Sequence, residues 1–415
     1  MIEFPHPVPI ESLASLKCEN LAIRSNASDG FTVFLDFRER SRLSPSSTEK
    51  SLSLLQSHSP PNGLSFSGWV GFFGYEFLAA NLGLSLKAKR DLEVPDGWFG
   101  RPETILRLSS QGTSIESREP TREKEIESLL IHSLSEETTE ISFPGKSLGC
   151  NLDFERYERI FAQAQQAILD GETYQIKISQ RFEAESKVDP LRAFAKLHQA
   201  NPAPESFLLQ TPDFSLVSCS PEVVIDKVGQ RITTRPIGGT YERSTTKQDP
   251  SVIERFLSDP KEVSEHNMLV DLERNDLSAL CIPGTVRIER FREVETYAHL
   301  HHLVSTISGE LRPELGLREI LRAMLPGGSI TGCPKIRTME WIDRLEPCFR
   351  GPYTGSFGTL ADNGDLRLNL IIRAMLVLKD KCYTQAGGGI VVDSTPGYEF
   401  KENRIKAQAL LDLLQ

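Results

Sequence analysis

The chain has 415 residues, of which 39% are hydrophobic and 25% are charged, and this is the balance of a globular protein with a substantial core. Its formal net charge is −10 and its lysines and arginines are scattered, so the sequence predicts no nucleic-acid partner. No segment approaches the roughly 18 apolar residues of a membrane helix, and the seven cysteines form no CxxC pair, so we expect a reduced, cytoplasmic protein without membrane contact.

The first part of the chain is predicted to be rich in strands. Short apolar runs such as FTVFLDF and GWVGFFGYEF alternate there with glycine, proline and serine. From Ser109 to Gly149 the composition shifts to serine, threonine and glutamate, and EKEIESLLIHSL predicts one helix inside this polar connection. We therefore separate an N-terminal region at 1–140 from a second region at 150–413, and we expect the two to intertwine into one globular unit.

The second region opens with a predicted helix and a predicted strand. FERYERIFAQAQQAIL repeats its apolar residues every three to four positions, begins behind the capping candidates Asn151 and Asp153, and stops at Gly171. TYQIKISQRFEAE then alternates with the period of a half-buried strand. One face of this strand holds Tyr174, Ile176 and Ile178. The other face, which is polar and can line a pocket, holds Gln175, Lys177 and Ser179.

Further helices are predicted at 260–276, 317–324, 334–345 and 397–413, with strands between them. The strands cluster without a regular strand–helix–strand rhythm, and GWVGFFG lacks the spacing of a dinucleotide-binding loop. The sequence therefore predicts an α+β fold and argues against a doubly wound nucleotide-binding fold.

Two pairs of carboxylates stand three residues apart on predicted helices. Glu262 and Glu265 form one pair, and Glu399 and Glu402 form the other, with Lys406 one turn further along. Together they offer the hard oxygen ligands that Mg²⁺ prefers. From spacing alone, two solvated helix faces are the more common explanation, because such pairs are frequent on protein surfaces.

Other candidate residues also have structural explanations. His302 can act as an acid or a base near neutral pH, although single histidines are usually structural. Gly387 to Gly389 can let backbone N–H groups approach an anion, or can simply form a tight bend. The run LPGGSITGCPKIR predicts a glycine-rich turn that opens a helix, which is suited to a carboxylate or phosphate. Arg373 lies inside the apolar run LRLNLIIRAMLV, which predicts a strand, and it needs a partner, either a bound carboxylate or an internal acid.

Taken in order, eight segments of residues 150–413 resemble the chorismate-utilising enzymes, whose members include the large subunits of anthranilate and aminodeoxychorismate synthases, with isochorismate and salicylate synthases as relatives. They are YQIKISQRF, SPE at Ser220 to Glu222, RPIGGT, KEVSEHNMLVDLERND, HLVST, GGSITGCPKIR, AGGGIVVDS and EFKENRIKA. The resemblance implies two large antiparallel sheets packed as a sandwich, with helices outside and the active site between the layers. Residues 1–140 are similar, more weakly, to the N-terminal region of anthranilate synthase component I.

The resemblance also implies roles for individual residues. It implies Mg²⁺ as cofactor, with Glu265 and Glu402 as principal ligands and Glu262 and Glu399 beside them. It implies catalytic roles for His302 as general acid, Glu222, Gln175 and Thr240. It implies a substrate cradle formed by Thr331, Gly332, Tyr353, Arg373, Gly387, Gly388, Gly389 and Lys406.

The position of Gln175 separates amination from hydration in this family. Relatives that add water to the chorismate ring carry a lysine base there, and an amide cannot deprotonate water, whereas ammonia is already a nucleophile. Amination is therefore favoured over isochorismate or salicylate formation, for which Lys177, two residues displaced, is the only nearby replacement base. A non-catalytic chorismate-binding protein is the remaining alternative.

Two signals disagree about which ring carbon is aminated. Aminodeoxychorismate synthases typically carry PIKGT, with a covalent lysine, and anthranilate synthases carry PIAGT, whereas this chain has Gly238 at the variable position. Ile330 and Thr331 resemble the aminodeoxychorismate subgroup. The sequence thus favours 4-amino-4-deoxychorismate, a precursor of p-aminobenzoate and folate, with anthranilate synthase, a lyase, as the alternative. It contains no recognisable glutaminase, so ammonia is expected from a separate glutamine amidotransferase subunit.

Overall fold

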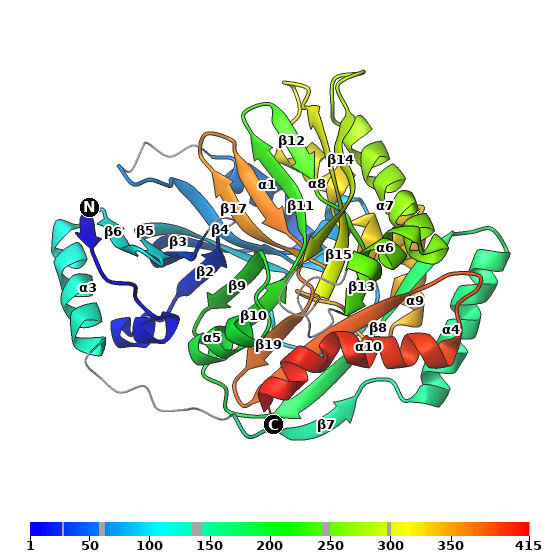
Figure 1. Ribbon diagram of the computed structural model, residues 1–415, viewed down its shortest axis with the longest axis horizontal. Coiled ribbons are helices and arrows are strands. Elements are labelled where there is room, and N and C mark those ends of the chain that lie inside the picture. The colour runs from blue at the N-terminus through cyan, green and yellow to red at the C-terminus, as the bar shows by residue number, and fades with distance from the viewer. Residues whose placement is uncertain (27–28, 58–62, 135–142, 243–249, 297–299, 415) are drawn as a thin grey trace.

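The computed structural model describes residues 1–414 except for 27–28, 58–62, 135–142, 243–249 and 297–299, and leaves the side chains of residues 240, 242, 250–252, 261 and 300 undescribed. The strands pair antiparallel and the helices lie outside them (Figure 1). The predicted α+β class is confirmed.

The first sheet combines strands that are far apart in the sequence. In spatial order it contains β7 (Lys146–Cys150), β8 (Gln175–Glu185), β20 (Lys381–Ile390), β19 (Ala374–Leu378), β10 (Ser215–Ser220), β9 (Glu205–Gln210), β2 (Leu21–Ser25) and β3 (Phe31–Arg42). The short β16 (Gly332–Cys333) pairs with the start of β8. Because β2 lies beside β9, the N-terminal segment shares a sheet with the second region.

The second sheet continues from the first through one long pair of strands. It contains β5 (Gly97–Ser109), β4 (Gly68–Phe73), β17 (Ser356–Ala361), β18 (Leu366–Asn369), β11 (Val223–Val228), β12 (Arg231–Thr234), β15 (Leu300–Glu310), β13 (Ile237–Glu242) and β14 (Arg287–Thr296). β6 (Gly112–Ser117) and β1 (Ile2–Phe4) extend the far half of β5. The pairing of β3 with β5 joins the two sheets along its whole length.

The alternation of side chains along the strands creates separate cores on the two faces of each sheet. In β9, Phe207 enters the core between the sheets and Leu208 enters the outer core. In β4, Val70 enters the core between the sheets and Trp69 enters the opposite outer core. Phe207 of the first sheet stacks on Phe357 of the second, with ring centroids 4.1 Å apart. The sheets therefore pack face to face, as the resemblance implies.

Helices cover the outer faces in three groups. The first sheet is covered by η1 (Ile10–Leu16), α3 (Pro120–Ser133) and α5 (Pro190–Ala200). The second is covered by α1 (Thr48–Leu55), α2 (Tyr75–Asn81), α7 (Pro260–Ser278) and α8 (Leu317–Met324). The third group is α4 (Phe154–Leu169), α9 (Lys335–Leu345) and α10 (Pro396–Leu411), which pack on β8 and β20. The short η2 (Pro45–Ser47), α6 (Pro250–Ser258), η3 (Gly328–Ile330) and η4 (Asp412–Leu414) complete the elements.

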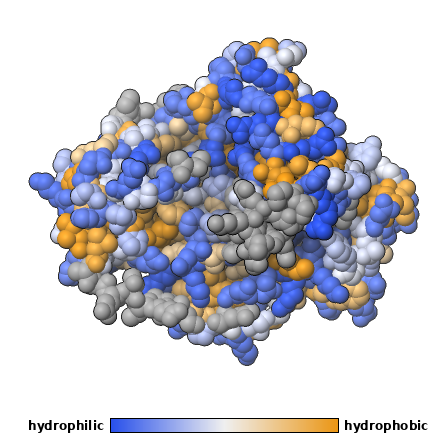
Figure 2. Space-filling view, viewed as in Figure 1, coloured by the Kyte–Doolittle hydropathy of each residue, from blue (hydrophilic) through white to orange (hydrophobic). Residues whose placement is uncertain are grey.

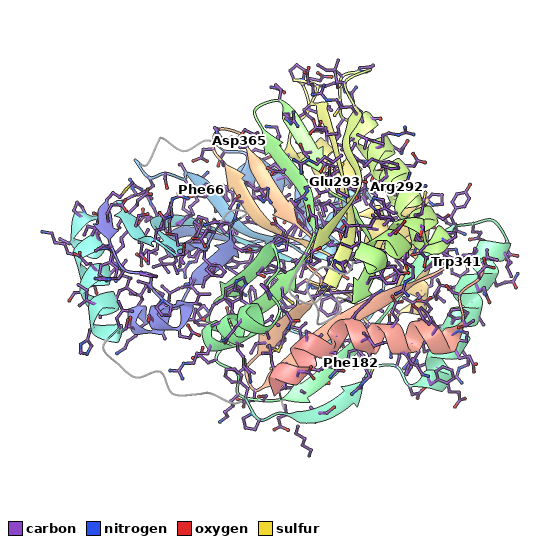
Figure 3. All side chains as sticks on the ribbon, viewed as in Figure 1. Phe66, Phe182, Arg292, Glu293, Trp341 and Asp365 are labelled. Carbon is purple, nitrogen blue, oxygen red and sulfur yellow. The ribbon has the colours of Figure 1, made fainter. Side chains whose placement is uncertain are left out.

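The last helix holds the strands of the substrate-site motifs in place. In Figure 1, α10 lies along β8 and β20, and Figure 3 marks Phe182 of β8 beneath it. Phe182 packs with Ala386 of β20 and Ala407 of α10. This packing positions the carboxylates of α10 next to the glycine run of β20.

Two local predictions are corrected by the structure. Tyr174 is 73% exposed and does not share the buried face of Ile176 and Ile178, because β8 begins only at Gln175. The run GWVGFFGYEF is not one strand, because Gly74 ends β4 and Tyr75 opens α2. The predicted cap of α4 is confirmed, since Asp153 accepts the backbone N–H of Arg156 at 2.8 Å.

None of the helices in the described ranges is long and apolar enough to cross a membrane. On the face shown in Figure 2, hydrophilic and apolar residues are interspersed.

Candidate active site

The three consecutive glycines lie near the end of β20, opposite Ser179, Ile178 and Lys177 of β8. They form no bend. A β-carbon on Gly387 would stand 2.9 Å from the hydroxyl oxygen of Tyr353, and one on Gly388 would stand 2.3 Å from Oε2 of Glu399. One on Gly389 would stand 2.0 Å from Nε2 of Gln175. The glycines are therefore required by close approach, because three side chains rest directly on the strand.

The carboxylate pair of α10 lies over these glycines. Glu399 is 5% exposed, and its Oε1 accepts a hydrogen bond from the Ser394 hydroxyl at 3.1 Å. Its Oε2 is buried without a hydrogen-bond partner. Burial, together with the nearby charge of Glu402, raises the pKa of Glu399 to about 7. A pair of solvated carboxylates on a helix surface is thus wrong for Glu399.

Lys406 connects the same helix to β20. Its Nζ lies 3.0 Å from Oε1 of Glu402 and donates to the carbonyl of Gly387 at 3.4 Å. Burial would raise the pKa of Glu402, but the ammonium of Lys406 outweighs it and the net pKa is lowered. Two neighbouring carboxyls therefore differ in protonation, Glu402 being the charged one near neutral pH.

The second carboxylate pair lies on α7. Glu262 is partly buried, and its Oε2 lies 2.5 Å from the point where a β-carbon on Gly239 would stand. Glu265 is exposed, but its charge acts on Lys177, as does the charge of Glu402. The helices α7 and α10 thus present one carboxylate each to the same lysine.

These carboxylates do not form a ready-made metal site. Within the described ranges, no three acidic, histidine or cysteine side chains come together closely enough to hold an ion. The pair Glu399 and Glu402 still fits a magnesium ion, because one oxygen of Glu399 is buried without a partner. Magnesium is commonly bound through one or two carboxylates, with water and substrate completing the shell.

Glu222 lies where β10 leads into β11, and the charges of Lys177 and Arg373 act on it. It is 5% exposed and accepts a hydrogen bond from the hydroxyl of Ser329 at 3.3 Å. Burial raises its pKa to about 7, against the attraction of Lys177. Behind it, Glu273 of α7 accepts a hydrogen bond from the hydroxyl of Thr234, and burial together with the charge of Glu222 raises its pKa to about 8.

Arg373 is not inside a strand, as its apolar surroundings in the sequence suggested. It stands immediately before β19 with a left-handed φ of 47°, and its carbonyl accepts the backbone N–H of Cys219 at 3.1 Å. Its guanidinium makes no ion pair with any residue of the described ranges, so an internal acid does not neutralise it. Its charge acts on both Glu222 and His302, which makes it the cation between them.

His302 lies on β15 and is 2% exposed. Its Nδ1 is 3.5 Å from the carbonyl oxygen of Gly239. Burial, and then the charge of Arg373, lowers its pKa to about 4. Without substrate, the side chain is therefore a neutral imidazole that donates a hydrogen bond rather than an imidazolium. Thr240 pairs with His302 in the β13–β15 ladder, and its side chain lies outside the described part of the chain.

The segment GGSITGCPK holds β8 rather than forming an open loop. Gly332 has a φ of 139°, and a β-carbon on it would stand 1.9 Å from the carbonyl oxygen of Gln175. Thr331 is buried, and its hydroxyl donates to the carbonyl of Gly327 at 3.0 Å. Helix α9 begins directly afterwards at Lys335. The predicted glycine-rich turn before a helix is confirmed.

The candidate site thus draws its residues from segments separated by up to about half the chain. These residues are Gln175, the glycines, Arg373, Glu222, His302 and the two carboxylate pairs. Residues 18–412 match the family described as chorismate binding enzyme. The chain belongs to this family. It is 34% identical over 361 residues to aminodeoxychorismate synthase component 1 of Bacillus subtilis, which covers 84% of this chain and 77% of that protein. It is 33% identical over 396 residues to anthranilate synthase component 1 of Lactococcus lactis, covering 92% and 84%.

Solved structures of chorismate-utilising enzymes share the fold of this family member. Anthranilate synthase component I of Streptococcus pneumoniae superposes with a TM-score of 0.76 at 25% identity, over 100% of this chain and 92% of that one. The menaquinone-specific isochorismate synthase of Escherichia coli superposes with a TM-score of 0.77 at 18% identity, over 100% and 94%. The chain is therefore a chorismate-utilising enzyme whose specific reaction is to be argued from its own residues.

Some residues of this chorismate-binding enzyme's site were not expected from the sequence. Ser329 and Glu273, which contact or act on Glu222, belong to motifs that were quoted without a role for either residue. Glu273 follows Glu262 by three helical turns on α7, and this spacing was the available signal. The buried Asn403, which donates to the side-chain carbonyl of Gln180 at 3.1 Å, carried no such signal.

Proposed function

We propose that this enzyme uses ammonia to replace the C4 hydroxyl of chorismate and so forms 4-amino-4-deoxychorismate. The observation that carries the proposal is Gln175, whose amide nitrogen lies against Gly389 where a water-activating base would be needed. An amide does not take a proton from water, whereas ammonia attacks without such help. The relative named aminodeoxychorismate synthase component 1 supports the same reaction.

The site supplies the charges that the substrate requires. Chorismate carries two carboxylates, and the site offers two cations, Arg373 beside Glu222 and His302 and Lys406 at Gly387. Because Gly387 to Gly389 carry no side chains of their own, the side chains of Tyr353, Glu399 and Gln175 lie close against this strand and can surround the ring. Fixing both carboxylates holds the ring so that the departing hydroxyl and the incoming nitrogen have one orientation.

Proton transfer at the departing hydroxyl is assigned to His302. A bound dianion would favour the charged imidazole and so oppose the burial and the charge of Arg373 that hold its pKa near 4 in the free enzyme. Glu399 and Glu402 would hold a magnesium ion, which would neutralise one substrate carboxylate. Glu222, half-protonated near pH 7, lies near Lys177 and Arg373.

The ammonia is proposed to come from a separate glutamine amidotransferase subunit. We expect free ammonium at mildly alkaline pH to replace that subunit, because the chemistry needs only the neutral amine. We propose a cytoplasmic location, which suits the free cysteines of this chain.

Anthranilate synthesis is the second candidate. It is favoured by Gly238, which removes the lysine typical of aminodeoxychorismate synthases, and by the similarity to anthranilate synthase component 1. The test is product identification after incubation with chorismate, Mg²⁺ and ammonium, with and without an added 4-amino-4-deoxychorismate lyase. Lyase-dependent p-aminobenzoate supports the proposal. Anthranilate with release of pyruvate would replace it by the second candidate, and isochorismate would exclude both.

A further inference from the structure

Lys177 lies on the polar face of β8 beside Gln175 and has no role in the proposed function. It lies opposite Gly389 in the strand ladder, and its Cε is 3.5 Å from the point where a β-carbon on Gly389 would stand. Gln175 reaches the same glycine from two residues earlier. Because side chains two residues apart share one face of a strand, both project onto the glycine run.

The amine is surrounded by charged groups from three other segments. Glu222 acts on it from the start of β11, Glu265 from α7, and Glu402 and Lys406 from α10. These are the segments that carry the proposed substrate and metal residues. Lys177 therefore lies within the site rather than on its outer wall.

Two other partly buried lysines of this protein have a fixed partner. Lys335 pairs with Asp276 at 3.2 Å and Lys406 pairs with Glu402 at 3.0 Å. Lys177 makes no side-chain hydrogen bond and no ion pair in the part of the chain that the structure describes. Burial and then the charge of Lys406 lower its pKa to about 8, so a substantial neutral fraction exists at mildly alkaline pH. Such an amine is a competent nucleophile.

Position 238 offers no room for a lysine in this chain. A β-carbon on Gly238 would stand 2.6 Å from Nδ1 and 2.9 Å from Cα of His266, which lies on α7. Any side chain there would push α7 away from β13.

We propose that Lys177 is the nucleophile of the amination, an inference that rests on the proposed function. Its neutral amine forms a bond to C2 of the chorismate ring. The two ring double bonds shift by one position each and the C4–oxygen bond breaks. His302, charged once the substrate is bound, donates the proton with which the hydroxyl leaves as water, and the proton lost from the amine nitrogen replaces it. Ammonia then forms a bond to C4, the double bonds shift back, and the C2–nitrogen bond to Lys177 breaks, with the proton lost from ammonia returning to the amine of Lys177. The sum is chorismate plus ammonia giving 4-amino-4-deoxychorismate plus water, with no oxidant or reductant.

The direct test omits ammonia. The full chain is mixed with chorismate and Mg²⁺, quenched with acid within one turnover, and examined by intact mass and peptide mapping. We expect an addition of one chorismate less one water, located on Lys177. Turnover with ammonia by a protein that shows no adduct on Lys177 overturns the inference, and so does an adduct on Lys406 instead.

Two variants test whether Lys177 acts as a nucleophile or only supplies a positive charge. Lys177→Arg keeps the cation and Lys177→Gln keeps a polar side chain, and neither can form the adduct. We expect both to lose adduct and to lower kcat by about 100-fold or more, while the chorismate concentration that half-saturates binding changes little. Lys187→Gln, at an exposed lysine beyond β8, is the matched control and keeps wild-type turnover. Wild-type kcat in Lys177→Arg overturns the inference.

Failure of the proposed function gives a different pattern. An adduct on Lys177 without any aminated product in the presence of ammonia contradicts amination and leaves the nucleophile in place. Amination that persists in Lys177→Gln contradicts the nucleophile and leaves the proposed function in place.

Discussion

Glu399 of α10 rests on Gly388 of β20, with its Oε2 2.3 Å from the point where a β-carbon on that glycine would stand. The contact fixes the height of the helix over the strand and leaves the same oxygen buried without a hydrogen-bond partner. A glycine in the middle of a strand weakens the strand unless a close approach requires it. Here the approach delivers a carboxylate to the proposed substrate site.

Gly388→Ala is therefore expected to displace the Glu399 carboxylate. We expect kcat/KM for chorismate to fall by at least about tenfold, and the free energy of unfolding to fall by about 1–3 kcal/mol from overpacking. Steady-state kinetics over a range of Mg²⁺ concentrations and urea denaturation measure the two effects. Gly397→Ala on the same helix meets no atom within 4 Å and is the control. Equal effects from the two substitutions would contradict the role given to this contact.

Arg373 is expected to bind a substrate carboxylate, because no described acid pairs with it. Replacing it by glutamine removes one charged hydrogen-bonding group, for which about 1.5–3 kcal/mol is typical. We expect kcat/KM for chorismate to fall by about 10- to 150-fold, with the higher KM carrying much of the loss. Initial rates across chorismate concentrations check this. Arg318→Gln, on α8, is the control and should behave like the wild type. An unchanged KM in Arg373→Gln would show that Arg373 does not bind the substrate.

Glu273 gives a prediction about pH and stability. Burial raises its pKa to about 8 in the folded protein, above the usual 4.5, so the folded state holds the proton more tightly than the unfolded state. The stabilisation of the folded state by the protonated Glu273 is thus fully present below about pH 4.5 and is lost as the pH rises through about 8. Glu273→Gln keeps a neutral side chain that can accept from Thr234.

We expect Glu273→Gln to be more stable than the wild type at pH 8.5 by roughly 1–3 kcal/mol, and to differ little at pH 5. Urea denaturation at both pH values measures the difference. A gain of the same size at pH 5 would show that the effect is unrelated to proton binding.

The sequence predicted much of this arrangement where a local pattern or a motif carried the information. The cap at Asp153, the strand from Gln175 and the helix that bears Glu262 and Glu265 follow from spacing between neighbours. The α+β class and the face-to-face sheets also agree with the expectation. Each of these depends on interactions within one element or on a long series of matching motifs.

The other features of the site depend on which distant segments contact each other, and the local patterns of a single sequence do not reveal those contacts. The three glycines could equally have formed a bend, and only the register with Lys177 and Ser179 shows a straight strand under three side chains. Arg373 was placed inside a strand because its neighbours are apolar, whereas the chain turns there with a positive φ. The crowding of Gly238 by His266 depends on α7 lying over β13, which no local pattern reveals.

The stacking of Phe207 on Phe357 provides a test of how the two sheets are held together. The rings are nearly parallel, with an interplanar angle of 8°, and both side chains are buried in the core between the layers. Phe357→Ala removes a buried ring and leaves a cavity, which typically costs about 3–5 kcal/mol. Phe357→Leu retains most of the volume and loses only the stacking and part of the contact area, so we expect a cost of about 1–2 kcal/mol. Urea denaturation monitored by tryptophan fluorescence, which reports on Trp69 and Trp98 in the two adjoining cores, measures both. A loss below about 1 kcal/mol in Phe357→Ala would mean that the layers close over the cavity and that their spacing is not set by this pair.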